Sequence, residues 1–196
     1  MRHDLTLIQP WIQQGARVLD LGCGDGTLLA ALRDQRGAFG IGLEIDHDNI
    51  NQALARGVNV IEHDLNTGLA NFRDNSFDMV VMTMALQTLR YPHLVIDEML
   101  RVGRECVVTF PNFGYWRSRW YLGTKGKMPV SKFLPYTWYD TPNIHFCTVR
   151  DFDQLCEDKG IRILNSRYID ASNSQGALCA RMPNLLSVTA VYHISK

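Results

Sequence analysis

Short apolar runs alternate with amphipathic segments from residue 4 to residue 110 of the chain. This alternation is typical of a parallel β-sheet that is covered by helices on both faces. The strands are expected at 16–21, 38–44, 58–63, 77–83 and 104–110. The helices are expected at 4–14, 26–36, 47–56 and 92–102. The pattern therefore predicts an α/β fold.

Residues at the ends of these segments support the helix boundaries. Asp25 and Asp46 can cap the helices at 26–36 and 47–56, and Pro92 suits the first turn of the helix at 92–102. A glycine, which readily ends a helix, follows each of the four segments: Gly15, Gly37, Gly57 and Gly103.

The regular alternation stops after Phe110. The next segment, residues 111–148, contains four prolines, has no clean period and is long for a connection. We call it the aromatic segment, because it holds ten of the nineteen aromatic residues of the chain. It also carries five basic residues against the single acid Asp140: Arg117, Arg119, Lys125, Lys127 and Lys132. Three interpretations remain open: a lid over a substrate pocket, a surface for a protein partner, and core packing.

Regular structure is expected again beyond the aromatic segment. A helix is predicted at 149–159 and a strand at 161–169. A polar loop follows to about residue 183, and a last strand is predicted at 185–194.

Composition limits the classes of protein to which the chain can belong. A chain of 196 residues, 46% of them hydrophobic, suffices for one core but is short for two, so residues 1–196 are expected to form a single domain. Lys plus Arg equals Asp plus Glu at 20 each, which argues against nucleic acid or a membrane surface as a partner. The sequence has neither a signal-peptide core nor an apolar stretch that could span a bilayer. Its five cysteines lack the spacing of a metal site or a disulfide framework, so we expect no metal and a cytoplasmic location.

The stretch VLDLGCGDG at 18–26 combines a buried strand with a glycine-rich turn before a helix. Such a turn lets the backbone approach a ligand closely. A phosphate-binding P-loop is excluded because no lysine follows the glycines. A dinucleotide is disfavoured because Asp25 would repel a pyrophosphate group. The stretch therefore favours a positively charged ligand.

Two further acids follow the next expected strands. Glu44 ends the second strand about twenty residues after the glycine turn, where an acid can bind both hydroxyl groups of a ribose. Asp64 follows the third strand, where it could accept a hydrogen bond from an adenine amino group beside Leu65, although a capping role is the simpler alternative. Because parallel strands end at one edge of a sheet, we expect these acids in one crevice. Replacing Glu44 at its strand end is expected to leave the fold intact.

Together these motifs resemble the class I S-adenosylmethionine-dependent methyltransferases. The resemblance implies a Rossmann-like, three-layer α/β/α fold with a seven-stranded sheet, an antiparallel last strand and the aromatic segment inserted after strand five. It also implies that S-adenosylmethionine or S-adenosylhomocysteine is the cofactor. The cofactor-binding residues by this resemblance are Asp20, Gly22, Cys23, Gly24, Gly26, Glu44, Ile45, Asp64, Leu65 and Met82.

A catalytic residue is not evident from the sequence. The run after the fourth strand, up to residue 89, lacks the Asn/Asp-Pro-Pro-aromatic motif with which amino-methylating members hold a planar amino group. Gln87 cannot act as a general base, although many members that methylate small molecules have a histidine or glutamate near this position. His93 and His145 are better explained as structural residues. The catalytic residues therefore stay unassigned.

Three stretches narrow the resemblance: residues 18–46, 80–92 and 107–148 are similar to the MetW family of methionine-biosynthesis proteins. Membership would imply an accessory or regulatory role beside the homoserine O-acyltransferase MetX. S-adenosylmethionine is made from methionine, so its binding could report the output of the pathway. Two alternatives remain: a methyltransferase that acts on a small molecule, and, less favoured by the neutral net charge, one that acts on nucleic acid through the basic residues of the aromatic segment.

Overall fold

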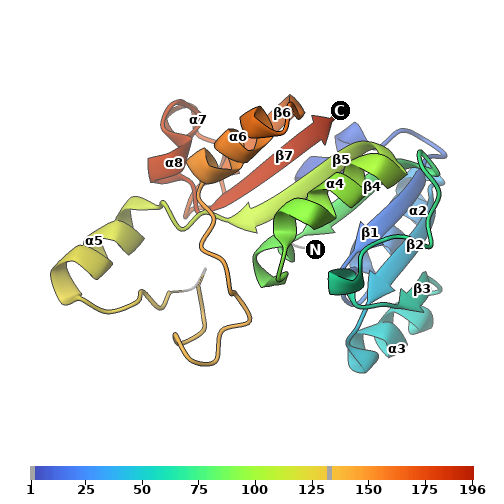
Figure 1. Ribbon diagram of the computed structural model, residues 1–196, viewed down its shortest axis with the longest axis horizontal. Helices are drawn as coiled ribbons and strands as arrows, with labels where there is room; N and C mark the ends of the chain where they lie inside the picture. The colour runs from blue at the N-terminus through green and yellow to red at the C-terminus, as the bar shows by residue number, and fades with distance from the viewer. Residues whose placement is uncertain (1–2, 132–133) are drawn as a thin grey trace.

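The computed structural model describes residues 3–131 and 134–196, so that Lys132 and Phe133 of the aromatic segment lie outside the described residues. Its centre is a seven-stranded sheet with helices on both faces (Figure 1). The strands are β1 (Arg17–Leu21), β2 (Phe39–Glu44), β3 (Asn59–Glu62), β4 (Phe77–Thr83), β5 (Gly103–Pro111), β6 (Arg162–Ile169) and β7 (Thr189–Ser195).

The strand order across the sheet is β3-β2-β1-β4-β5-β7-β6. Strands β1 to β5 pair in parallel, and β7 is antiparallel to both β5 and β6. This topology confirms the predicted fold class, including the antiparallel last strand and the insertion after the fifth strand.

Eight α-helices lie among the described residues. They are α1 (His3–Ile8), α2 (Thr27–Arg36), α3 (His47–Ala55), α4 (Pro92–Val102), α5 (Trp116–Lys125), α6 (Val149–Asp158), α7 (Ala177–Arg181) and α8 (Pro183–Leu186). Three short 3-10 helices accompany them: η1 (Gln9–Trp11), η2 (Leu65–Thr67) and η3 (Leu86–Thr88). No helix among the described residues is long and apolar enough to cross a membrane.

Alternate strand residues divide the core into two layers, one on each face of the sheet. Leu19 of β1 packs with residues of α4 and α6, whereas its neighbour Val18 packs with residues of α1 and α2. Since successive side chains of a strand point to opposite faces, this division follows from the apolar runs themselves. Strands buried on both faces explain why the runs are continuously apolar.

Two helix starts test the predicted capping residues. Asp46 caps α3 as predicted, because its Oδ1 accepts a hydrogen bond from the Asn49 N–H at 2.9 Å. Asp25 accepts from the Thr27 N–H at 3.1 Å, but the residue that immediately precedes α2 is Gly26, which has a left-handed conformation. Asp25 therefore supports the first turn of α2 from one residue further back than a capping residue.

Two predicted boundaries and one predicted loop are wrong. The helix expected at 4–14 ends at Ile8 and continues only as η1, because Pro10 has no N–H to bond to the preceding turn. The last strand begins at Thr189 instead of residue 185, since the preceding residues form α8. Helix α7 lies in the stretch that was expected to be a polar loop.

The aromatic segment also contains a helix that its sequence did not predict. Helix α5 has no buried residue, so it lacks the apolar stripe by which an amphipathic helix is recognised. In Figure 1, α5 and the residues after it extend away from the sheet.

Candidate functional site

The strand register brings the predicted cofactor residues to one edge of the sheet. Leu21 at the end of β1 pairs with Leu43 of β2 and Met82 of β4, and Glu44 pairs with Glu62 of β3. A cavity of about 350 Å³ opens at this edge. It is lined by Leu5, Asp20, Gly22, Cys23, Gly24, Asp25, Thr27, Leu28 and Thr83. We call it the acidic cavity, because Asp20 and Asp25 are its charged lining residues.

Two glycines of the turn serve different purposes. Both have positive φ angles, +55° at Gly24 and +75° at Gly26. A Cβ at Gly26 would lie 3.0 Å from the Ala53 Cβ of α3, so close packing and the positive φ together favour glycine there. No atom lies within 4 Å of the position that a Cβ at Gly24 would take. Gly24 therefore leaves open space where the backbone borders the acidic cavity.

Glu44 holds the glycine turn to the end of β2. Its Oε2 accepts from the Gly24 N–H at 2.8 Å, and its Oε1 accepts from the N–H groups of Ile45 and Asp46 at 2.8 and 3.0 Å. The side chain is buried. Loss of the carboxylate would leave these backbone donors without their acceptor, which is costly in a buried place. The expectation that replacing Glu44 leaves the fold intact stays a prediction, and these hydrogen bonds add that such a variant would be less stable.

An ion pair holds the other end of the glycine turn. The Arg56 Nη2 lies 3.0 Å from the Asp25 Oδ2, and the Arg56 Nη1 donates to the Asp25 carbonyl oxygen at 2.6 Å. Arg56 directly follows α3, so this contact joins α3 to the turn before α2. With Glu44 on one side and Arg56 on the other, the turn is held in place by both of its neighbours.

The remaining predicted residues do not line the acidic cavity. Asp64 caps η2, and its Oδ1 accepts from the Asn66 N–H and Nδ2, each at 2.9 Å. These hydrogen bonds lower the pKa of Asp64. Ile45 is exposed, whereas Leu65 and Met82 are buried in the core. The ligand contacts predicted for these residues stay predictions.

The pKa of Cys23 depends on its burial and on the negative charges near it. Burial, followed by the negative charges of Asp20, Glu44 and Asp25, raises it to about 12. Cys23 packs against Gly42 of β2, where a Cβ would lie 2.8 Å from the Cys23 Cβ. The thiol is therefore neutral at physiological pH, and the surrounding potential is negative.

Four lining residues were missed by sequence reasoning, among them Thr27, the first residue of α2. Leu5 comes from α1, Thr83 from the end of β4 and Leu28 from the first turn of α2. Leu5 carries no motif, and only the packing of α1 beside the sheet brings it to the cavity. Thr83 could have been found, because it is the last residue of a strand that ends at the same edge.

The turn after β4 is constrained by hydrogen bonds. Met84 has φ +58°, which is uncommon for a residue other than glycine, and its N–H donates to the carbonyl oxygen of Thr109 at 2.9 Å and to its Oγ1 at 3.1 Å. Gln87 is buried, with its Nε2 donating to the Met84 carbonyl oxygen at 2.8 Å. The Gln87 carbonyl oxygen accepts from the N–H groups of Ile144 and His145 at 2.9 and 3.1 Å. Gln87 therefore joins the aromatic segment to the turn after β4.

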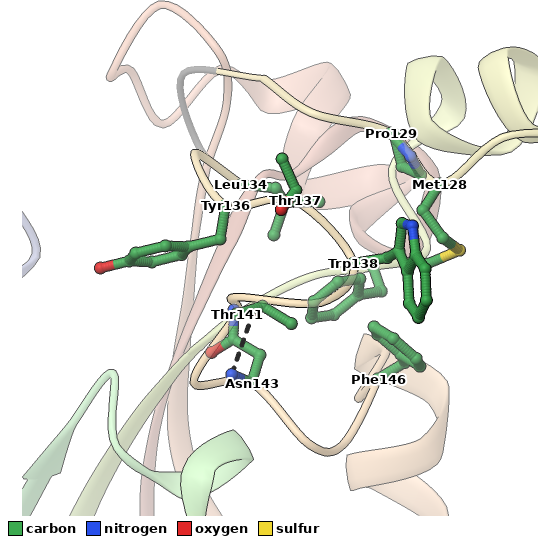
Figure 2. A pocket seen from close by; sticks show the side chains of 10 residues that line it. Met128, Pro129, Leu134, Tyr136, Thr137, Trp138, Thr141, Asn143 and Phe146 are labelled. Carbon is green, nitrogen blue, oxygen red and sulfur yellow. Dashed lines mark hydrogen bonds between the residues drawn. The ribbon is translucent and has the colours of Figure 1, made fainter.

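A small cavity lies within the aromatic segment. Figure 2 shows its lining residues, among them Leu134, Trp138 and Phe146, around a hydrogen bond of 3.1 Å from the Asn143 N–H to the Thr141 Oγ1. The volume is about 30 Å³, which suffices for a water molecule or two and not for a metabolite. This cavity is a gap in the packing of the segment and not a substrate pocket.

Among the described residues, no group of three histidine, cysteine or acidic side chains is arranged to hold a metal ion.

Solved structures of low sequence identity share the fold. An S-adenosylmethionine-dependent methyltransferase from Mesorhizobium loti superposes with a TM-score of 0.69 at 18% identity, over 100% of this chain and 98% of the other. One from Archaeoglobus fulgidus also gives 0.69, at 17% identity, over 98% and 94%. The [4+2]-cyclase SpnF gives 0.68 at 16% identity, over 98% and 80%. A fold that includes a cyclase does not by itself determine the reaction.

Relatives in sequence are more specific. A bifunctional methionine biosynthesis protein MetXA/MetW of Rhodopirellula baltica is 36% identical over 189 residues, which cover 92% of this chain and 30% of that longer protein. A demethylmenaquinone methyltransferase of Bacillus licheniformis is 26% identical over 82% of this chain and 76% of its own length. The family model of methionine biosynthesis protein MetW matches residues 2–194. The chain therefore belongs to the MetW family of methionine biosynthesis proteins.

Proposed function

We propose that the acidic cavity binds S-adenosylmethionine or S-adenosylhomocysteine, and that the protein acts as an accessory or regulatory partner of the homoserine O-acyltransferase MetX. The observation that carries the first part is the charge of the cavity. Its lining includes two carboxylates, Asp20 and Asp25, and no lysine or arginine, although Asp25 is paired with Arg56 behind the turn. Such a lining favours a ligand with an ammonium or sulfonium group over a phosphate.

The residues around the cavity fit such a ligand. The open face of Gly24 and the acids of the lining would take the amino-acid part. Glu44 would accept from one ribose hydroxyl, since its three backbone hydrogen bonds leave free one of the about four acceptor positions of a carboxylate. Asp64 and Leu65 would lie by the adenine. The bound cofactor would supply an electrophilic methyl group if an acceptor is present.

The partnership with MetX draws on the Rhodopirellula relative, whose single chain bears both the MetXA and the MetW names. We propose that a separate MetX chain binds to the aromatic segment. Trp138 and Tyr139 are 75% and 74% exposed, and α5 has no buried residue. Exposed tryptophan, tyrosine and arginine are typical of the centres of protein interfaces. In this proposal residues 1–196 form one domain that presents the segment as its docking surface.

The partnership can be tested with a matched pair of variants. Tyr139→Ala should weaken binding of the purified protein to MetX in a pull-down or by calorimetry. Phe39→Ala removes an aromatic side chain of the same 74% exposure at the start of β2, and should leave binding unchanged. If both variants bind MetX as tightly as the unmodified protein does, the aromatic segment is not part of the interface.

Regulation requires that the ligand and the partner affect each other. Calorimetric titration with S-adenosylmethionine should give a different affinity when MetX is present, by a factor in the range of about 5 to 150 for ordinary allosteric coupling. The affinity for MetX must change by the same factor when the ligand is added. Binding of the ligand with no such coupling would leave an accessory protein without a sensing role.

A methyltransferase acting on a small molecule is the second candidate. Its support is the sequence similarity to the demethylmenaquinone methyltransferase of Bacillus licheniformis. Release of S-adenosylhomocysteine from S-adenosylmethionine, in a cell extract from which proteins have been removed, would distinguish it. Formation of the product that depends on added protein would favour catalysis, and ligand binding without turnover would favour the accessory role.

A further inference from the structure

A second cavity, of about 360 Å³, lies among the helices that follow β5. It is lined by Arg119, Val149, Arg150, Asp153, Arg181, Met182, Pro183, Asn184 and Leu185. We call it the basic cavity, because three arginines and one acid are its charged lining residues. It shares no lining residue with the acidic cavity.

The charges of the basic cavity are not neutralised by ion pairs. In the described part of the chain, the side chains of Arg150 and Arg181 make no hydrogen bond or ion pair. Arg119 is held in place, with its Nε donating to the Gly114 carbonyl oxygen and its Nη2 donating to that of Asn184 at 3.3 Å. The one acid, Asp153, accepts from the Tyr192 hydroxyl at 2.6 Å. Three guanidinium groups therefore line the cavity with one carboxylate to balance them.

The position of Arg150 is also unfavourable for the stability of helix α6. It is the second residue of α6, whose N-terminus carries the partial positive charge of the helix. A cation in the first turn opposes this charge and so destabilises the helix. An anion bound between Arg150 and the other arginines would turn this repulsion into attraction.

A buried asparagine fixes the walls of the basic cavity relative to one another. The Asn112 side chain is 3% exposed, and its Nδ2 donates to the carbonyl oxygens of Asn184 and Ser187 at 3.2 and 2.9 Å. Its Oδ1 accepts from the N–H groups of Gly114 and Val149 at 2.9 and 3.3 Å. Asn112 thus joins the residues before α5, the start of α6 and the α8 region. The cavity is a built feature and not an accidental gap between mobile loops.

We propose that the basic cavity is a binding site for a small organic anion with at least two negative charges, carried by carboxylate or phosphate groups. Arg119, Arg150 and Arg181 bind the charged groups, and guanidinium groups pair well with both kinds. Val149, Met182 and Leu185 contact the apolar part of the ligand. The volume lies at the lower end of the range of about 300–1,000 Å³ for small-molecule sites. The net charge of zero disfavours nucleic acid as the anion.

The test uses citrate and pyrophosphate as probes in calorimetric titrations at constant ionic strength. At least one probe should bind the unmodified protein, and the double variant Arg150→Gln/Arg181→Gln should weaken that binding by about tenfold or more. The control, Arg36→Gln/Arg73→Gln, removes the same charge from arginines outside the basic cavity and should leave the affinity unchanged. Thermal unfolding of each variant verifies that it is folded.

The outcomes separate the two kinds of anion and can overturn the proposal. Preference for citrate identifies a carboxylate ligand, and preference for pyrophosphate identifies a phosphate ligand. The proposal fails if neither probe binds the unmodified protein, or if the control variant loses as much affinity as the double variant. Titration with S-adenosylmethionine is a separate readout, so that the result does not depend on the proposed function of the acidic cavity.

Discussion

The acidic and basic cavities have almost the same volume, about 350 and 360 Å³, and opposite charge. The acidic cavity is built at the carboxyl edge of parallel strands, where residues close in sequence meet. The basic cavity is built from helices α5 to α8. Its three lining arginines, Arg119, Arg150 and Arg181, follow one another at intervals of 31 residues in sequence. The acidic cavity can therefore be predicted from the sequence more readily than the basic cavity.

The difference matters for ligand choice as well. A neutral chain can hold separate regions of strong local potential, so that a net charge of zero argues against a uniformly charged surface and not against a charged site. The acidic cavity suits a cation and the basic cavity an anion. Experiments that remove one cavity and leave the other intact therefore give the sharpest test of both.

The largest expected effect concerns the reactivity of Cys23 in the acidic cavity. At pH 8.5 alkylation by iodoacetamide should be about a thousandfold slower in the folded protein than in urea, because a pKa of about 12 leaves little of the reactive thiolate. Peptide mapping by mass spectrometry measures the rate at this residue. Asp20→Asn should speed the reaction, since Asp20 is the acid with the largest charge effect on this thiol. Alkylation as fast as in urea would contradict the raised pKa of this buried thiol.

The second effect concerns the hydrogen bonds of Asn112 that join the walls of the basic cavity. Asn112→Ala should lower the free energy of unfolding by about 3 kcal/mol, because several buried backbone groups lose their hydrogen-bond partner. Urea denaturation measures the change. The control Asn71→Ala removes an exposed amide and should stay within about 0.5 kcal/mol. Equal stability of the two variants would show that Asn112 does not hold the walls together.

The third effect concerns the attachment of the glycine turn. Glu44→Gln should lower the free energy of unfolding by about 2 kcal/mol, because an amide cannot accept on both sides from the three backbone N–H groups. Glu62→Gln changes the paired residue on β3, whose side chain is 64% exposed, and should have little effect. Anion binding in the basic cavity should be unaffected by either change. A Glu44→Gln variant as stable as Glu62→Gln would mean that the turn does not depend on this carboxylate.

The smallest effect tests whether the open face of Gly24 receives a ligand. Gly24→Ala and Gly160→Ala impose similar backbone strain, at φ +55° and +65°, and neither added Cβ meets an atom within 4 Å. Both should therefore lose about 1–2 kcal/mol of stability. Only Gly24→Ala should weaken binding of S-adenosylmethionine, by about tenfold, in calorimetry. An equal affinity in the two variants would place the ligand elsewhere.

Sequence reasoning succeeded where the determining interactions are local. The strand before the glycine turn, the end of β2 at Glu44 and the capping role of Asp46 follow from apolar runs, spacing and residue type. It failed at Pro10, whose effect on the first helix was not weighed, and at α5, which has no buried stripe. It also missed that the Glu44 carboxylate accepts from the glycine turn, because that contact depends on how closely β1 and β2 pack.

By itself the sequence determined the order of strands and α-helices from β1 to β5 and the acids that follow β1, β2 and β3. Periods of two and 3.6 residues and the chemistry of glycine, proline and aspartate act over a few residues, so they can be read along the chain. Only the tertiary structure decided that Leu5 and Thr83 border the acidic cavity, and that Arg119, Arg150 and Arg181 share the basic one. These groupings arise when distant segments pack on the sheet and are joined by Asn112, and no local pattern encodes which segments will meet.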